Sequence, residues 1–335
     1  MCIRDRTKPL IYHNDGAPES LWELFFNDSP NKEYCTEQIN PSIDFYKGGF
    51  YIYKCIFYNL WSPLYISTHN LKVVHSECTF TRCRCSQGGA IYVQGECSIV
   101  QHRYCTSSCS STNAGSHSCI DLIKDSQTNL NYDLEGSLSC NIGTTGTNFH
   151  LKGKLIISSM NYSKNLAVES ACFWTNSPSI NTVNYSNFEE NHATTHCQIF
   201  YNYNTIFSMD HCNILKNYQE DGLYATIYSA GNLSFDYCSF LGDLGEGAVF
   251  YSDSRQITLS HSYYDNLAAN ANITNIENQQ SSESNTLTFF VNFECNTQMT
   301  VNQNQIKCYC SPGESISYPF LRMFIYSMPT LYKIK

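Results

Sequence analysis

The feature that most limits the possible folds is an internal repeat that runs through most of the chain. Each copy has two apolar residues in alternation, a short polar break, a small residue, a large residue two positions later, and then Asn or Cys. Clear copies begin at Leu71, Leu155, Phe207, Leu233 and Ile257. Because the apolar residues alternate by two, the repeat predicts short strands rather than helices.

The large residue of each copy measures the length of the repeat. It is Phe57, Phe80, Tyr104, Tyr162, Phe188, Ile214, Phe240 and Tyr264, with steps of 23, 24, 58, 26, 26, 26 and 24 residues. We interpret the step of 58 residues as two coils of 29. A second column of aromatic residues has a similar step and consists of Tyr92, Trp174, Tyr201, Tyr228 and Tyr251. Two columns that share one step indicate units stacked directly on each other.

A single short coil cannot bury its apolar face alone, so the coils must stack in parallel, about 4.8 Å apart. The repeat therefore predicts an all-β fold, a right-handed parallel β-helix that forms a single-stranded solenoid with coils of about 23–29 residues. We assign residues 45–275 to this solenoid. We expect residues 7–44 to form an N-terminal cap or incomplete coil, and residues 276–335 to form terminal coils or a C-terminal cap. Residues 1–6 look like a non-native scar from a sequencing adapter.

Two short motifs accompany the repeat. Phe188-Glu-Glu-Asn191 is an FxxN motif, and Gly88-Gly-Ala-Ile91 is a GGAI motif that follows Phe80 by eight residues. Together they resemble the repeats of chlamydial polymorphic outer-membrane proteins and of related protist surface proteins. The resemblance covers roughly residues 48–266. It implies a right-handed, pectin-lyase-like β-helix that is exposed at the cell surface, often in adhesin-like proteins.

Cysteine is unusually abundant, with 18 residues, which favours an extracellular or cell-surface location. Four cysteines occupy one column, two positions before the large residue, where we expect a ladder of buried thiols: Cys55, Cys78, Cys212 and Cys238. A denser group combines six cysteines with His102, and there we expect local disulfides: Cys83, Cys85, Cys97, Cys105, Cys109 and Cys119. No paired CxxC supports a zinc site, so we expect no metal. Because we take the N-terminus to be truncated, no signal peptide is expected in the sequence, and no membrane anchor is visible in it.

Composition narrows the class of partner. Only 15% of the residues are charged and the net charge is −9, so the chain lacks the clustered Lys and Arg that neutralise phosphates. We therefore expect no nucleic-acid partner, and we also expect no cofactor. The partner that we favour is a glycan or the surface of a host or neighbouring cell, because many of the 25 tyrosines could stack on sugar rings.

Two acidic pairs keep an enzyme hypothesis open. Asp210 and Asp236 both lie four residues before the large residue of their copy, and Glu220 and Glu246 both lie six residues after it. Each pair would sit on successive coils, about 5 Å apart, close enough to act as acid and base or to share a cation. Polar turns carry acidic residues without any role in most proteins, and no Lys or Arg stacks beside these pairs.

The sequence therefore predicts an adhesin-like domain for binding or display, without catalysis. The first alternative is a polysaccharide-active lyase or hydrolase that uses the stacked carboxylates. The second alternative is a structural spacer that neither binds nor turns over a ligand.

Overall fold

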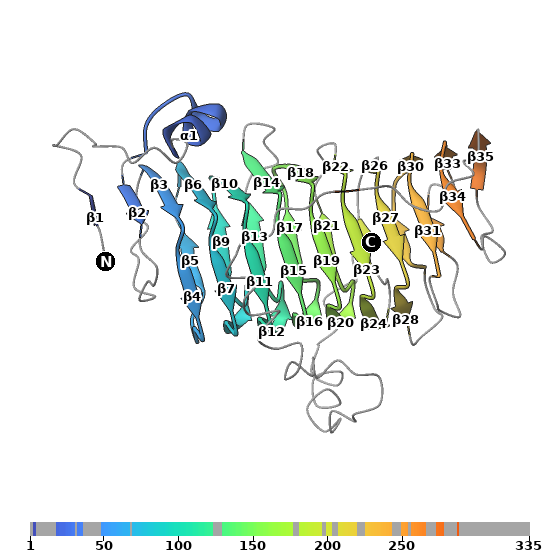
Figure 1. Ribbon diagram of the computed structural model, residues 1–335, viewed down its shortest axis with the longest axis horizontal. Helices are drawn as coiled ribbons and strands as arrows, with labels where there is room; N and C mark the ends of the chain where they lie inside the picture. Colours follow the sequence, from blue (N-terminus) through green and yellow to red (C-terminus); the bar gives the residue numbers. More distant parts are fainter. Residues whose placement is uncertain are drawn as a thin grey trace, which may run out of the picture.

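The computed structural model describes residues 3–4, 18–30, 32–35, 48–67, 69–122, 129–176, 181–195, 199–202, 207–219, 225–242, 249–253, 256–265, 273–277 and 287. In this part of the chain, the predicted fold class is confirmed: nearly all of the structure is β, and parallel sheets stack into a β-solenoid of about seven turns (Figure 1). The period-two alternation of the repeat explains the strands, since inward side chains such as Phe207 and Met209 are buried while Ser208 between them is only half-buried.

Four sheets run along the solenoid, and a complete coil visits sheets I, II, III and IV in that order. Sheet I contains β1 (Ile3–Arg4), β2 (Lys32–Cys35), β3 (Gly48–Tyr53), β6 (Leu71–Ser76), β10 (Cys97–His102), β14 (Leu130–Leu134), β18 (Lys154–Ser158), β22 (Asn181–Asn184), β26 (Phe207–Asp210), β30 (Leu233–Asp236), β33 (Ile257–Ser260) and β35 (Ile273–Glu277). Sheet II contains β4 (Ile56–Tyr58), β7 (Thr79–Thr81), β11 (Cys105–Ser107), β15 (Ser137–Ser139), β19 (Asn161–Ser163), β23 (Asn187–Glu189), β27 (Asn213–Leu215), β31 (Ser239–Leu241) and β34 (Tyr263–Tyr264).

Sheet III contains β8 (Arg84–Gln87), β12 (Ser110–Ala114), β16 (Ile142–Thr145), β20 (Leu166–Glu169), β24 (His192–Thr195) and β28 (Tyr218–Gln219). Sheet IV contains β5 (Leu64–Ser67), β9 (Ile91–Gly95), β13 (Ser118–Leu122), β17 (Asn148–Leu151), β21 (Phe173–Asn176), β25 (Phe200–Asn202), β29 (Ile227–Ser229) and β32 (Phe250–Ser252). Neighbouring strands of the described residues pair in parallel, apart from the antiparallel pair β1 and β2.

Helix α1 (Pro18–Phe26) lies in the segment predicted as an N-terminal cap and packs on the outward face of sheet I (Figure 1). Its Trp22 is buried with Tyr51, Val74 and Val100, which are outward residues of β3, β6 and β10. Asn27 ends the helix in the left-handed conformation, with φ of 52°, as is common just after a helix. The apolar outward residues of the first coils are thus covered. Of the predicted C-terminal segment, only residues 276–277 and 287 are among the described residues.

The pairing of sheet II corrects one step of the predicted repeat. Phe80 pairs with Thr106, and Thr106 pairs with Leu138, so Tyr104 does not belong to the column of large residues. The coil from Thr106 to Leu138 is 32 residues long, which exceeds the predicted range of 23–29. Tyr104 occupies instead the column of Cys78, two positions earlier. The prediction failed here because the position was assigned by side-chain size, which changes from coil to coil.

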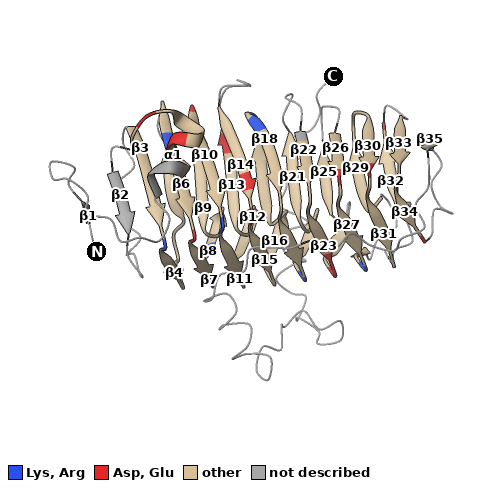
Figure 2. Cartoon of the chain, turned by 45° about the horizontal axis from the view of Figure 1, so that its top comes forward, with Lys and Arg blue, Asp and Glu red and all other residues tan. Residues whose placement is uncertain are grey.

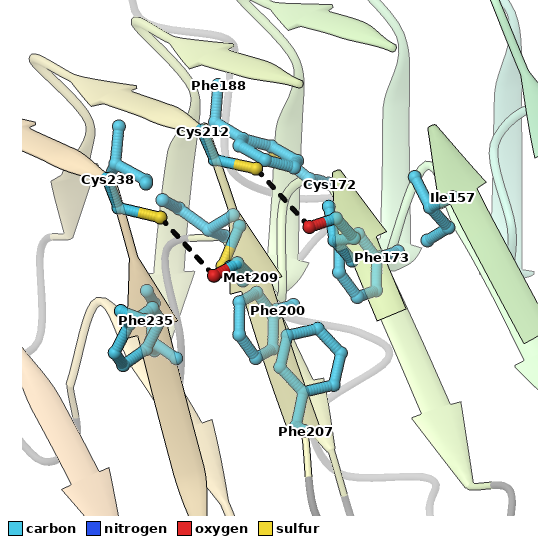
Figure 3. Close-up of a cluster of buried hydrophobic side chains, with 14 of the residues drawn as sticks. Ile157, Cys172, Phe173, Phe188, Phe200, Phe207, Met209, Cys212, Phe235 and Cys238 are labelled. Carbon is cyan, nitrogen blue, oxygen red and sulfur yellow. Dashed lines mark hydrogen bonds between the residues drawn. The ribbon is translucent and has the colours of Figure 1, made fainter. Parts of the chain in front are cut away.

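The interior holds two large apolar clusters that follow each other along the solenoid. Figure 3 shows part of the second cluster, where Phe173 and Phe200 stack with ring centroids 4.9 Å apart. The thiols of Cys212 and Cys238 lie in the same cluster and each donates to a carbonyl of the preceding coil, that of Val183 at 3.5 Å and that of Met209 at 3.6 Å.

A ladder of buried asparagines explains the FxxN motif. Each Asn donates its side-chain amide to the side-chain oxygen of the next one, from Asn141 through Asn165 and Asn191 to Asn217, over distances of 3.0–3.1 Å. The same amides also donate to backbone carbonyls, for example from Asn191 to Tyr162 at 3.0 Å. The ladder satisfies buried backbone groups at the corner between sheets II and III, which no apolar residue could do.

The GGAI motif forms the corner between sheets III and IV. Gly88 has φ of 56°, and a Cβ atom there would meet the carbonyl oxygen of Ile91 at 1.9 Å. A Cβ atom on Gly89 would meet the carbonyl oxygen of Ser116, in the next coil, at 2.2 Å. Ala90 and Ile91 are then buried in the interior. The two glycines are therefore required by close approaches of the backbone.

Candidate functional site

The predicted acidic pair Asp210 and Asp236 lies on the outward face of sheet I. The two residues end β26 and β30 and are direct partners in the parallel pairing, so they occupy successive coils. Their side chains are 39% and 46% exposed. The second predicted pair, Glu220 and Glu246, lies outside the described residues.

A histidine contacts each aspartate of this pair. The Nδ1 atom of His211 lies 2.8 Å from Oδ1 of Asp210, and that of His261 lies 2.9 Å from Oδ1 of Asp236. These histidines belong to a column of left-handed corner residues, with φ between 46° and 56°. From Lys54 to Tyr237, the residues of this column donate their backbone N–H to a carbonyl of the next coil, as His211 does to Asp236 at 3.0 Å. This repeated bond holds a conformation that non-glycine residues rarely adopt.

Rings stack along this corner. His211 lies between Tyr185, at 5.1 Å, and Tyr237, at 4.8 Å, and Tyr237 stacks on His261 at 4.7 Å. The arrangement places two carboxylate–imidazole pairs in an exposed row, a chemistry that can transfer protons. Within the described part of the chain, no three His, Cys, Asp or Glu residues are placed to hold a metal ion.

Nearer the N-terminus, the same corner carries charges of alternating sign. Lys54 lies 3.7 Å from Glu77, and Arg103 lies 2.7 Å from Glu135. The Glu135 carboxylate raises the pKa of Arg103 through a hydrogen bond. Elsewhere on the strands, charged residues are sparse (Figure 2). The charges of this corner are paired with each other, which leaves little net charge to attract a partner.

The most extended surface feature is an aromatic column on the outward face of sheet IV. We call this column the aromatic stripe, and it consists of Tyr65, Tyr92, Phe149, Trp174, Tyr201, Tyr228 and Tyr251. Cys119 takes the place of an aromatic residue in one coil, between Tyr92 and Phe149. Five of the rings follow one another without interruption.

The rings of the aromatic stripe stack face to face. The centroid distances are 4.5 Å from Phe149 to Trp174, 5.8 Å from Trp174 to Tyr201, 4.4 Å from Tyr201 to Tyr228 and 5.5 Å from Tyr228 to Tyr251. Their interplanar angles are between 1° and 10°. Since each ring covers the face of its neighbour, the rings that are exposed present mainly their edges to solvent.

Exposure and hydrogen bonding vary along the stripe. Tyr65 is 52% exposed and Tyr251 is 40% exposed, whereas Tyr228 is buried to 7% exposure. The Tyr228 hydroxyl donates to Asp253 at 2.6 Å, and burial raises the pKa of that hydroxyl. Burial also raises the pKa of Tyr92 to about 12. The hydroxyls of Tyr92 and Tyr228 therefore keep their protons at physiological pH.

Polar residues accompany the stripe on the same face. Ser67, Gln94 and Asp121 form a column two positions after Tyr65, Tyr92 and Cys119, and Asn176 and Asp253 lie at the equivalent position further along the solenoid. These side chains supply hydroxyl, amide and carboxylate groups next to an apolar surface. Aromatic edges beside hydrogen-bonding groups are typical of sites that recognise small polar molecules or their polymers.

The predicted column of large residues occupies the interior of sheet II. Phe57 and Phe80 stack at 4.6 Å, and Tyr162 and Phe188 stack at 5.3 Å. Further along the solenoid, Ile214 pairs with Phe188 and Phe240, and Phe240 pairs with Tyr264.

The predicted thiol ladder lies beside that column. Cys55, Cys78, Cys212 and Cys238 are buried thiols, at 0–1% exposure. These columns belong to the core and contribute no functional group to the surface.

The expected disulfides in the dense cysteine group are wrong for five of its members. Cys83, Cys85, Cys97, Cys109 and Cys119 are free in the structure. Cys83 and Cys109 lie together in the interior, where each thiol donates to a backbone carbonyl of the preceding coil. Cys97 lies in the interior of sheet I, whereas Cys119 lies in the outward column of sheet IV. Neighbours in sequence therefore point to different sides of the solenoid.

Sequence reasoning identified most of the aromatic stripe as a column, but it missed Tyr65 and Phe149 and did not predict that the column faces outward. The signal was available, because Tyr92 lies between the buried apolar residues Ile91 and Val93. An aromatic residue flanked in this way points away from the core.

Comparisons with known proteins give no relative for this chain. No family model, no curated protein and no solved structure matches it. No helix among the described residues is long and apolar enough to cross a membrane.

Proposed function

We propose that the protein is a cell-surface or secreted binding domain of the adhesin type, and that the aromatic stripe contacts a neutral, linear glycan. The single observation that supports this function is the outward row of five consecutive stacked rings from Phe149 to Tyr251. The row rises by about one ring every 4.8 Å, which is comparable with the length of one pyranose unit in an extended polysaccharide. A glycan that lies along the solenoid axis would pass one ring per sugar, with Tyr228 recessed between its neighbours.

Rigidity and charge support a neutral glycan. Stacked rings lose little side-chain freedom when a ligand binds, so more of the contact energy appears as affinity. The chain carries a net charge of −9, and carboxylates such as Asp121 and Asp253 flank the stripe. These charges would repel a polyuronide but accept hydrogen bonds from the hydroxyls of a neutral sugar.

The finer family relationship is part of the same proposal. We infer that the solenoid is a right-handed, pectin-lyase-like β-helix related to the polymorphic outer-membrane protein repeats. The support is the role of the motif residues: Asn191 lies in the buried ladder, and Gly88 and Gly89 form a corner where no Cβ atom fits.

Binding can be tested by titration calorimetry with neutral hexasaccharides, such as β-1,4-linked glucose and mannose oligomers, on the full chain and a double variant, Trp174→Ala with Tyr201→Ala. We expect measurable binding to the unaltered protein and affinity reduced at least about tenfold in the variant, since central aromatic residues dominate such contacts. The matched control is Tyr185→Ala, which removes an exposed ring from the corner stack. No binding to any neutral glycan, or equal loss in the control, would contradict the proposal.

A second candidate function is favoured by the two carboxylate–imidazole pairs at Asp210 and Asp236, a polysaccharide-active lyase or hydrolase. The same oligosaccharides, together with polygalacturonate and calcium, can be incubated with the protein and analysed for shorter products. Turnover that is lost in Asp236→Ala, while binding is kept, would establish catalysis. Binding without any product leaves the adhesin-type function.

The proposed location has its own test. Intact source cells can be labelled with a biotin reagent that does not cross membranes, and the chain recovered by antibody. Labelling of intact cells, or recovery of the chain from the culture medium, is expected. Labelling only after lysis would contradict an extracellular location.

A further inference from the structure

A polar layer crosses the interior between the two apolar clusters. One inward column of sheet I is apolar at Ile52 and again from Ile157 onward, but three successive coils between them carry His75, Gln101 and Asp133. All three polar side chains are buried, at 0–1% exposure. We use the name polar layer for seven residues: His75, Gln101, Tyr104, His117, Asp133, Asn148 and His150.

The Asp133 carboxylate is the centre of this layer. The hydroxyl of Tyr104 and the amide of Gln101 donate to its Oδ1 atom at 2.6 and 2.8 Å. The amide of Asn148 donates to Oδ2 at 2.6 Å, and Nε2 of His150 lies 3.4 Å from the same oxygen. These partners come from two sheets and one corner, so the carboxylate ties opposite sides of the coil together. A buried charge with several donors is stable as long as the donors keep their positions.

The same hydrogen bonds fix the protons of two histidines. Because the Gln101 amide donates to Asp133, its Oε1 atom is left to accept. It accepts from Nε2 of His75 at 3.0 Å and from Nε2 of His117 at 3.1 Å. The Nδ1 atom of each ring is buried and has no hydrogen-bond partner among the described residues. A second proton on either ring would therefore create a buried charge and an N–H group without an acceptor.

We propose that the polar layer is an acid-sensitive junction, at which the solenoid loosens as the pH falls below neutrality. At neutral pH, the layer joins the two apolar clusters through the neutral rings of His75 and His117 and the hydrogen-bonded side chain of Asp133. Under acid, the folded state cannot accept protons at His75 and His117 without breaking the layer. The chain then gains protons by opening at this point, while the apolar clusters on either side keep their packing.

The pKa shifts of the two histidines have the direction that the proposal requires. Burial lowers the pKa of His75 to about 4 and also holds that of His117 well below its usual range. The unfolded state binds a proton near pH 6.5. The stability that these neutral rings contribute is therefore complete above pH 6.5 and is lost as the pH falls toward 4. Each such histidine raises the unfolding equilibrium constant by about tenfold per pH unit over this range.

Four other ionisable groups interact with one or both of these rings. They are His102 on β10, Tyr104 at the corner before β11, Asp133 on β14 and His150 on β17. Of these, His102 adds to the same effect from the outward face of sheet I, because burial lowers its pKa to about 4.

Urea unfolding of the full chain between pH 7.5 and pH 4.5 tests the proposal with one variant. His75→Leu continues the aliphatic column and removes one titrating ring. The unfolding equilibrium constant of both proteins should rise as the pH falls. For each pH unit, we expect the rise in the variant to be about tenfold smaller than in the unaltered protein. The matched control, Ile157→Val in the same column, should shift stability by the same amount at every pH. An unchanged pH slope in His75→Leu would overturn the proposal.

Two measurements on the unaltered protein keep the test open if the variant fails to fold. Histidine NMR should show at least two of the ten rings still neutral at pH 5. Hydrogen exchange at pH 4.5 should show residues 97–122 and 129–151 losing protection before residues 181–195 and 207–219. Titration of all ten rings near pH 6.5, or uniform loss of protection, would contradict an acid-sensitive junction.

Discussion

At the scale of single residues, the solenoid tolerates a large side chain in one coil because the next coil makes room for it. Tyr104 stands in a column that holds Cys78 in the preceding coil and Gly136 in the following one. A Cβ atom on Gly136 would lie 2.7 Å from the Tyr104 ring and 2.7 Å from the Met160 methyl group. The Tyr104 hydroxyl can therefore reach Asp133, and the polar layer depends on this pair of unequal residues.

Gly136→Ala should destabilise the fold by about 1–3 kcal/mol, because the added methyl group overpacks a core without free space. Urea unfolding at pH 7.5 measures the change. Gly143→Ala is the matched control, since Gly143 pairs with Ala167 and its column already accepts alanine. Equal effects of the two substitutions would contradict the packing that we describe.

At the scale of the strand, alternation was enough to predict which residues line the interior. Phe57, Phe80 and Phe188 follow from period-two patterning, and their coils repeat regularly. The position of Tyr104 could not be predicted, because a column in a stack constrains the summed volume of neighbours and not the size of each member. The free state of Cys97 and Cys119 was missed for a related reason, since spacing alone does not show which side of the coil a residue faces.

The asparagine ladder gives a prediction for the corner between sheets II and III. In Asn191→Ala, the backbone amide of Asn165 and the carbonyl of Tyr162 lose their partners in the interior. We expect a loss of at least about 2 kcal/mol in the free energy of unfolding, as for buried polar groups left without hydrogen bonds.

Asn187→Ser provides the comparison for this prediction. Asn187 lies on the outward side of sheet II, in a column that already contains Ser137 and Ser239. Its substitution should change stability by less than about 1 kcal/mol, since serine occurs naturally in that column. A loss as large as that of Asn191→Ala would show that the buried ladder has no special role.

At the scale of the whole molecule, the candidate sites were only partly visible in the sequence. The spacing of Asp210 and Asp236 predicted their stacking, but their contacts with His211 and His261 depend on corner geometry that no motif encodes. Most rings of the aromatic stripe appeared as a regular column, but only the assembled coils show that five of them, from Phe149 to Tyr251, follow one another without interruption. In the function that we propose, affinity would come from repetition, because successive coils add similar contacts.

The dependence of affinity on glycan length tests the central claim most directly. Neutral oligosaccharides of one type, from two to eight sugars, can be titrated calorimetrically into the unaltered protein at pH 7.5. If the stripe from Phe149 to Tyr251 binds one sugar per coil, affinity should rise with each added sugar and level off at about five, the number of consecutive stacked rings. Affinity that does not change with length, or the absence of binding at every length, would contradict the account.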